Sequence, residues 1–247
     1  MLEISIKAEH LFELWRIPVT NSMLLAFISV LLLLFVGWLI NHKINIIPGK
    51  LQSIFELLIE QILQLMDSVF GDRRISERYF PVVTTVFLFI LTSNWLGLLP
   101  IVGPIGLREV SEGHQSFIPL LRAPSADLNF TIALAIMAVF AVNFFSVSAL
   151  GIRKYAGRFI HPKDPIMTGV GLLEIVSEFV KIVSFSFRLF GNVFAGEVLL
   201  LIVGFLVPLI VPLPFLFLEV FVGFIQAFIF AMLTMVFIAG AVAKTEH

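Results

Sequence analysis

Long apolar runs separated by short polar segments divide the chain into recognisable helical stretches. A helix of about 20 apolar residues is long enough to cross a hydrocarbon core of about 30 Å. Runs of this kind occupy residues 21–40, 80–99 and 128–150. Pro81 opens the second run and Pro100 closes it, while Ser125 or Asp127 is placed to cap the third helix. The pattern predicts three transmembrane spans.

Residues 49–70 show a different periodicity, in which polar side chains recur every three or four positions along an apolar segment. Such spacing places them on one face of a helix. They are Gln52, Glu56, Glu60, Gln64 and Asp67. We predict an amphipathic helix that lies at the membrane surface or against partner helices.

Two longer apolar stretches make up the last third of the chain. Residues 166–207 lack proline and would extend about 63 Å as a helix, and residues 215–243 would extend about 44 Å. The prolines between them are Pro208, Pro212 and Pro214. Both lengths exceed the bilayer, so residues 166–243 are predicted to form a hairpin of two long, strongly tilted helices. A break at Gly191 or Gly196 is the alternative.

Composition agrees with a membrane location. Hydrophobic residues make up 59% of the 247 residues, and the mean hydropathy is +1.05, whereas soluble domains have about 45–50% apolar residues. The chain contains no cysteine, and its histidines lie far apart, so we expect no disulfide and no metal site. We predict an all-α integral membrane protein with about five membrane helices plus one amphipathic surface helix. Residues 1–247 are expected to form a single membrane domain.

Basic residues predict the orientation of the spans. Segments 41–79 and 151–165 hold nine of them: Lys43, Lys50, Arg73, Arg74, Arg78, Arg153, Lys154, Arg158 and Lys163. The N-terminal tail and the loop after Pro100 hold four: Lys7, Arg16, Arg108 and Arg122. Because cytoplasmic loops carry the excess of Lys and Arg, the N-terminus is predicted outside and the C-terminus in the cytoplasm.

Polar residues form a stripe along each of the two long helices. On the first, residues at steps of three or four are Glu174, Ser177, Lys181, Ser184, Arg188, Asn192 and Gly196. On the second, they are Glu219, Gly223, Gln226 and Phe230. A charged group at the bilayer centre costs about 2.5–3.5 kcal/mol, so such a stripe is expected to face protein or water and to have a function.

The chemistry of the stripe suggests ion movement. Arg188 keeps its proton at every physiological pH, so it can attract a carboxylate and repel cations but cannot relay protons. Buried glutamates, by contrast, can take up and release protons near neutral pH. A fixed cation with glutamates displaced to either side predicts two proton paths separated by a barrier.

Structural interpretations remain open for part of the stripe. Lys181 either forms a structural ion pair with Glu178 or Glu174 or lies beside a proton path, and Glu178 is interpreted as structural. Arg188 and Glu197 are nine residues apart, which leaves them off a common face of a straight helix.

Several motifs resemble one known family, subunit a of the membrane (Fo) sector of F-type ATP synthases. They are NWLGLLP (94–100), PSADLN (124–129), RLFGN (188–192), AGE (195–197) and QAFIF (226–230). The resemblance covers nearly the whole chain, including the closing residues Glu246 and His247.

The resemblance implies a role for each matching residue. Arg188 would be the essential arginine that meets the carboxylates of the c-ring. The outer proton path would comprise Asn192, Glu197, Glu219 and Gln226, with Asn94, Ser125 and Asp127 nearer its mouth. The cytoplasmic path would comprise Glu174 and Ser177, with Lys181 beside it.

Two positions depart from the family pattern. Glu219 stands where some bacterial members carry histidine, so Glu197 and Glu219 would form a carboxylate pair that shares a proton. Gly97 stands where some members place an acid.

The implied protein is the proton-translocating stator subunit of a rotary motor, with no enzymatic activity, cofactor or nucleic-acid partner of its own. Its partners would be the c-ring, b-type peripheral stalk subunits, the lipid membrane and the translocated proton. Because no transit peptide precedes the first span, a multi-pass location in a bacterial plasma (inner) membrane is favoured, although an organelle-encoded copy would also lack one. The alternatives are a stand-alone secondary transporter or channel and a non-conducting membrane anchor.

Overall fold

The computed structural model describes residues 9–14, 17–42, 49–100, 102, 105–111, 114–152, 155, 157, 165–208 and 210–243. Its helices are α1 (Asn21–His42), α2 (Lys50–Phe70), α3 (Arg73–Gly97), η1 (Pro124–Ala126), α4 (Leu128–Leu150), α6 (Pro165–Leu206) and α7 (Pro212–Ala243). Within these ranges, five helices are long and apolar enough to cross a membrane, and they are α1, α3, α4, α6 and α7. With α2 as the amphipathic helix, the predicted all-α membrane fold is confirmed.

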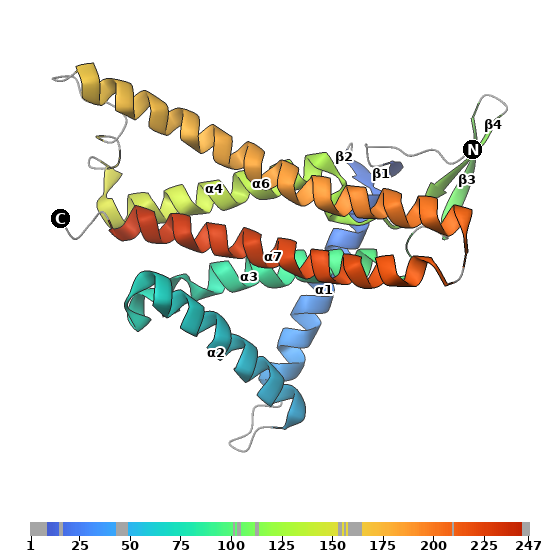
Figure 1. Ribbon diagram of the computed structural model, residues 1–247, viewed down its shortest axis with the longest axis horizontal. Helices are drawn as coiled ribbons and strands as arrows, with labels where there is room; N and C mark the ends of the chain where they lie inside the picture. The colour runs from blue at the N-terminus through green and yellow to red at the C-terminus, as the bar shows by residue number, and fades with distance from the viewer. Residues whose placement is uncertain are drawn as a thin grey trace.

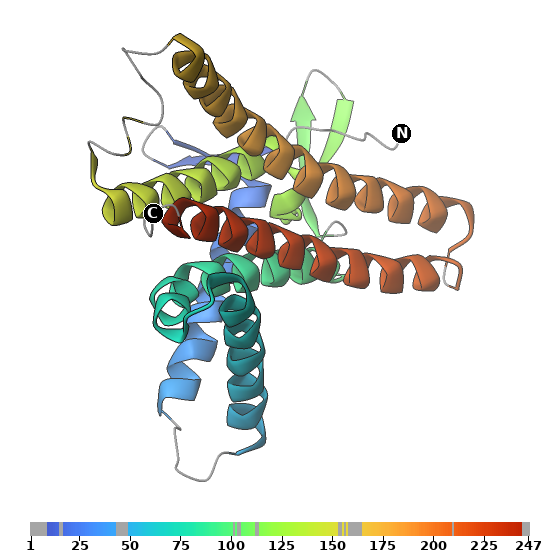
Figure 2. The ribbon, with the colours of Figure 1, turned by 60° about the vertical axis from the view of Figure 1, so that its left-hand side comes forward.

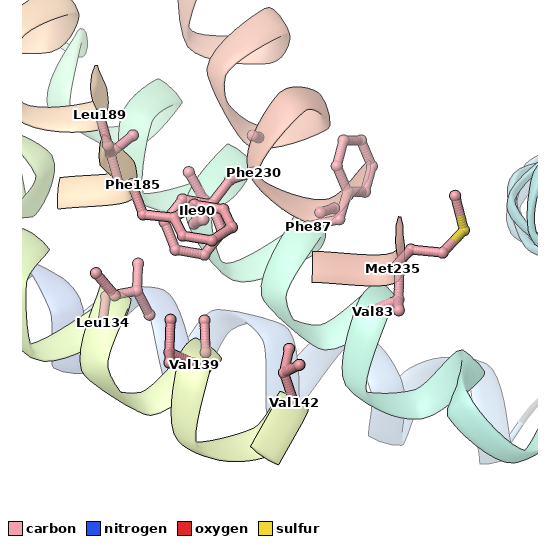
Figure 3. Close-up of a cluster of buried hydrophobic side chains, with 14 of the residues drawn as sticks. Val83, Phe87, Ile90, Leu134, Val139, Val142, Phe185, Leu189, Phe230 and Met235 are labelled. Carbon is pink, nitrogen blue, oxygen red and sulfur yellow. The ribbon is translucent and has the colours of Figure 1, made fainter. Parts of the chain in front are cut away.

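Helices α3, α4, α6 and α7 run alongside one another as a bundle, and α1 crosses them steeply (Figure 1). After a turn of 60°, α1 and α2 extend from the bundle as an arm (Figure 2). Buried side chains from all four bundle helices meet in one core (Figure 3), among them Val83, Phe87, Ile90, Leu134, Val139, Val142, Phe185, Leu189, Phe230 and Met235. The ring centroids of Phe185 and Phe230 are 4.5 Å apart, which holds α6 against α7.

The long hairpin consists of two continuous helices. Helix α6 has 42 residues and passes through Gly191 and Gly196 without a break, so the alternative of a broken helix is wrong. Helix α7 begins at Pro212 rather than at residue 215. Pro212 and Pro214 are tolerated there because amide groups in the first turn of a helix have no acceptor within that helix.

The second predicted span begins earlier than residue 80. Helix α3 starts at Arg73, and the carboxylate of Asp72 accepts a hydrogen bond from the amide of Arg74 at 2.8 Å. Pro81 therefore lies inside the helix and does not open it. An ion pair of 2.8 Å between Arg73 and Asp67 ties α3 to α2 at this corner. Pro81 removes one helical hydrogen bond, while the cap at Asp72 and the Arg73–Asp67 ion pair stabilise the turns that precede it.

The sequence left the cap of α4 open between two residues. The structure assigns it to Asp127, whose carboxylate accepts from the amide of Asn129 at 3.0 Å. Ser125 instead lies in η1, directly before the cap.

Two β-hairpins were not predicted. Strands β1 (His10–Leu14) and β2 (Ile17–Thr20) pair antiparallel before α1, and β3 (Gly106–Ser111) pairs with β4 (His114–Pro119) in the segment expected to be an irregular loop. The β3–β4 hairpin lies on the same side of the molecule as the turn between α6 and α7 (Figure 1). A hairpin depends on its turn and on the residues that pair across its two strands. The proline and glycine residues around β3 and β4 indicated a loop and gave no sign of this pairing.

Some predictions fall outside the described residues. They concern Lys7, Arg16, Lys43, Arg153, Lys154, Arg158, Lys163, Glu246 and His247.

Candidate functional site

Arg188 lies in the middle of α6 with its side chain exposed. Its Nη2 donates a hydrogen bond to the hydroxyl of Ser184, one turn earlier, at 3.1 Å. The neighbouring Val183 and Phe187 are each 55% exposed, so the surrounding face is apolar. Across the ranges that the structure describes, no carboxylate forms an ion pair with Arg188. A permanent charge on an apolar membrane face is costly unless water or an anion compensates it.

Small and polar residues continue the exposed face beyond Arg188. Asn192, one turn further along α6, is exposed, as are Gly191 and Ala195. A Cβ added at Gly191 would meet no atom within 4 Å. Small residues at such positions allow another membrane helix to approach closely.

The predicted stripe on α6 does not keep one environment. Gly196 is buried, whereas Arg188 and Asn192 are exposed. A Cβ at position 196 would overlap the carboxylate of Glu219 on α7. Glu219 is only 6% exposed. The absence of a side chain at Gly196 thus makes room for a buried acid between the two long helices.

Glu197 has a partner that the sequence did not indicate. Its Oε1 lies 3.6 Å from Nε of Arg122, and Arg122 is 7% exposed. Arg122 was counted only as a loop cation, because its distance from Glu197 along the chain gave no sign of contact. Its position two residues before the PSADLN motif was the available signal.

Hydrogen bonds join α3, η1 and α7 in a buried network. The Asn94 amide donates to the carbonyl of Gly223 at 3.1 Å, and the Ser125 hydroxyl donates to Asn94 Oδ1 at 2.6 Å. Asp127 is turned elsewhere, since its Oδ2 accepts from Ser22 on α1 at 2.8 Å. The network places Asn94 and Ser125 together, while Asp127 connects two helix ends.

The residues predicted for the outer proton path therefore lie in two different environments, one buried and one exposed. Glu219 and Gln226, on α7, are 6% and 8% exposed. Asn192, on α6, is exposed.

On the other half of α6, Lys181 is held by Glu178 at 2.6 Å, which selects one of its two predicted acidic partners. Asn143 on α4 donates to Glu178 Oε2 at 3.3 Å, and Tyr155 donates to Asn143 Oδ1 at 2.9 Å. The sequence missed Asn143 and Tyr155. These four residues tie α6 to α4.

Glu174 is partly buried and Ser177 is exposed, on the turns of α6 before this cluster. The chain thus has titratable and polar groups on either side of Arg188 along α6.

Comparison with known proteins identifies the family. A sequence model described as ATP synthase A chain matches residues 23–239. The chain belongs to this family. Membership makes it a multi-pass, proton-translocating component of the membrane sector of ATP synthase, and not itself the catalytic part of that complex. This replaces the alternatives of a stand-alone transporter and a non-conducting anchor.

Relatives of similar length support the assignment. The chain is 32% identical to ATP synthase subunit a of Moorella thermoacetica over 96% of this chain and 97% of the relative. It is 34% identical to ATP synthase subunit a of Campylobacter fetus over 88% of both chains. It is also 34% identical to the Helicobacter pylori (strain P12) protein of that name over 89% of this chain and 88% of the relative.

The contact at Gly196 leads to a first prediction. Gly196→Ala is expected to reduce ATP-driven proton pumping severalfold, because the added methyl group displaces the Glu219 carboxylate from its place against α6. Pumping is measured by fluorescence quenching in inverted membrane vesicles. Gly204→Ala on the same helix, where a Cβ meets nothing within 4 Å, is the matched control. Equal pumping by the two variants would contradict the prediction.

Proposed function

We propose that this chain supplies two offset half-channels and a blocking arginine, Arg188, at its interface with a c-ring, so that proton flow requires ring rotation. The observation that carries the proposal is the exposed guanidinium on an apolar face of α6, with no acid paired to it within the described chain. A ring of membrane helices with one carboxylate per subunit supplies the missing anion.

The arrangement along α6 supports two separate paths. Glu174 and Glu197 lie to either side of Arg188 at about 21 Å and about 13.5 Å along the helix, at about 1.5 Å per residue. The outer path would use Asn192, Glu197, Glu219 and Gln226, with the mouth at Asn94, Ser125 and Asp127. The cytoplasmic path would use Glu174 and Ser177, with Lys181 beside it.

In this mechanism, a proton enters from outside near Glu197 and Glu219 and neutralises a ring carboxylate. The neutral carboxyl group can then face lipid while the ring turns. It returns to Arg188 from the cytoplasmic side and loses its proton near Glu174. Because the guanidinium keeps its own proton, it cannot pass protons directly between the two paths. Each proton that crosses about 100 mV releases about 2.3 kcal/mol to drive rotation.

The proposal extends to the surroundings of the chain. The chain lies in a bacterial inner membrane, with its N-terminus outside and its C-terminus in the cytoplasm. This orientation places the segments rich in Lys and Arg, residues 41–79 and 151–165, in the cytoplasm. Residues 1–247 act as a single membrane domain in contact with the c-ring and with b-type peripheral stalk subunits.

The interface is tested by disulfide cross-linking. Because this chain contains no cysteine, an introduced cysteine is the only residue of the chain that can form a cross-link. Gly191→Cys is expected to cross-link to a cysteine placed beside the ring carboxylate, because position 191 is exposed one turn from Arg188. Gly37→Cys, equally open but on α1, is the control and is expected to stay uncoupled. Cross-linking at position 37 and not at 191 would place the ring on another face and overturn the proposal.

A further inference from the structure

A buried hydrogen bond joins α6 to α4 close to Arg188. The hydroxyl oxygens of Ser186 on α6 and Thr131 on α4 lie 3.2 Å apart, and both residues are 0% exposed. The Thr131 hydroxyl also donates to the carbonyl of Leu128 at 3.0 Å. Because a hydroxyl group has one proton to donate, Ser186 is the donor in the contact between the two helices.

Ser186 and Arg188 point to opposite sides of α6. They are two residues apart, which corresponds to about 200° around a helix. Phe185 and Leu189 are buried beside Ser186. Phe187 is exposed, as is Arg188. A rotation of α6 that keeps Ser186 against α4 therefore keeps Arg188 turned away from the bundle.

Burial alone holds α6 less firmly than its neighbours. A smaller share of α6 is buried than of α3, α4 or α7, and its N-terminal part diverges from the other bundle helices in both views (Figures 1 and 2). A further polar contact with α4, from Asn143 to Glu178, lies about 12 Å earlier along α6 and is only partly buried.

The hydrogen bond is more selective for one rotation of α6 than the apolar contacts are. In lipid, an apolar contact between helices gains little over a contact with acyl chains, whereas polar groups hold helices together. If α6 turned about its axis, the Ser186 hydroxyl would lose its partner in a buried environment, which is costly. The contact with Thr131 thus favours the rotation that the structure shows.

We propose that Thr131 and Ser186 are positioning residues, whose hydrogen bond sets the rotation of α6 and so keeps the Arg188 guanidinium facing the c-ring. This inference rests on the proposed function. A turning ring acts on the exposed face of α6, and α4 supports the opposite face. Helix α4 therefore has a role in coupling although it carries no residue of the proton paths beyond its cap.

The rotation of α6 is tested by the distance between two spin labels in the assembled complex, with no cysteine in the other subunits. The labels are attached after Leu172→Cys on α6 and Met137→Cys on α4, at two exposed positions. Leu172 lies about 100° around α6 from Gly191, away from the face proposed for the ring. Ser186→Ala is expected to broaden the distance distribution or to shift its maximum. Ser146→Ala is the matched control, because it removes a buried α4 hydroxyl that has no partner among the described residues.

Two variants of Thr131 separate the hydrogen bond from packing. Thr131→Val keeps the shape of the side chain and loses the hydroxyl, whereas Thr131→Ser keeps the hydroxyl and loses a methyl group. The valine variant is expected to change the distances as Ser186→Ala does. It is also expected to lower ATP-driven proton pumping, normalised to assembled complex, about threefold, the factor for one average hydrogen bond between membrane helices. The serine variant is expected to keep both properties. The double variant Thr131→Val/Ser186→Ala is expected to be no worse than either single variant, because both remove the same bond.

The outcomes separate the rotation of α6 from its effect on coupling. Unchanged distances in Ser186→Ala and Thr131→Val would overturn the proposal. An impaired Thr131→Ser beside a normal Thr131→Val would also overturn it, by showing that packing matters and the hydroxyl does not. Changed distances with wild-type pumping would overturn the link to Arg188. Failure of the proposed function is separately visible, because Arg188→Ala would then pump normally while the distances still report the rotation of α6.

Discussion

Arg188→Ala is expected to abolish ATP-driven proton pumping while the complex stays assembled. The side chain is exposed, and among the described residues it donates a hydrogen bond to Ser184. Removing it therefore leaves the bundle core intact. In the proposed mechanism, the variant lacks the fixed positive charge that a ring carboxylate meets before it releases its proton, so rotation and proton flow would lose their coupling.

The measurement compares pumping in inverted vesicles with passive proton leak after the catalytic head is stripped from the same membranes. Lost pumping with intact assembly, with or without a larger leak, supports Arg188 as the barrier between the paths. Ser184→Ala is the matched control, since it removes the partner hydroxyl but keeps the charge. Unchanged pumping by Arg188→Ala would return the arginine to a structural role.

Glu219→Gln is the second variant with a large expected effect. Glutamine has nearly the shape of glutamate, so it fits against Gly196 and in the buried space between α6 and α7. It cannot bind and release a proton near neutral pH. Coupled pumping is therefore expected to fall to a small fraction of the wild-type rate. Passive proton conduction through the membrane sector, measured after the catalytic head is removed, is expected to fall to the same extent.

The control for Glu219→Gln is the same substitution at an exposed acid, Glu56 on α2. Glu56 bonds only to Gln52 among the contacts described for it, so its loss should leave conduction unchanged. If membranes with the Glu219→Gln variant conducted protons at the wild-type rate, Glu219 would not be the acid that carries the proton.

Local patterns were sufficient to predict the helices. In a membrane each backbone amide and carbonyl must be paired within its own helix, so the length of an apolar run is enough to predict a span. The amphipathic helix α2 follows from the spacing of its polar residues, and the hairpin of α6 and α7 from two long apolar runs with prolines between them. The errors arose at the start of α3, which the cap at Asp72 placed earlier than expected, and in the two hairpins β1–β2 and β3–β4.

By itself, the sequence determined that the chain is a helical membrane protein with a charged, polar stripe centred on Arg188, because these features depend on neighbours within one helix. Only the tertiary structure decided which groups on different elements meet. It brought Arg122 to Glu197, placed Glu219 against Gly196, and turned Asp127 towards α1. Such contacts depend on how the helices cross and on the space between them, and no local periodicity encodes either.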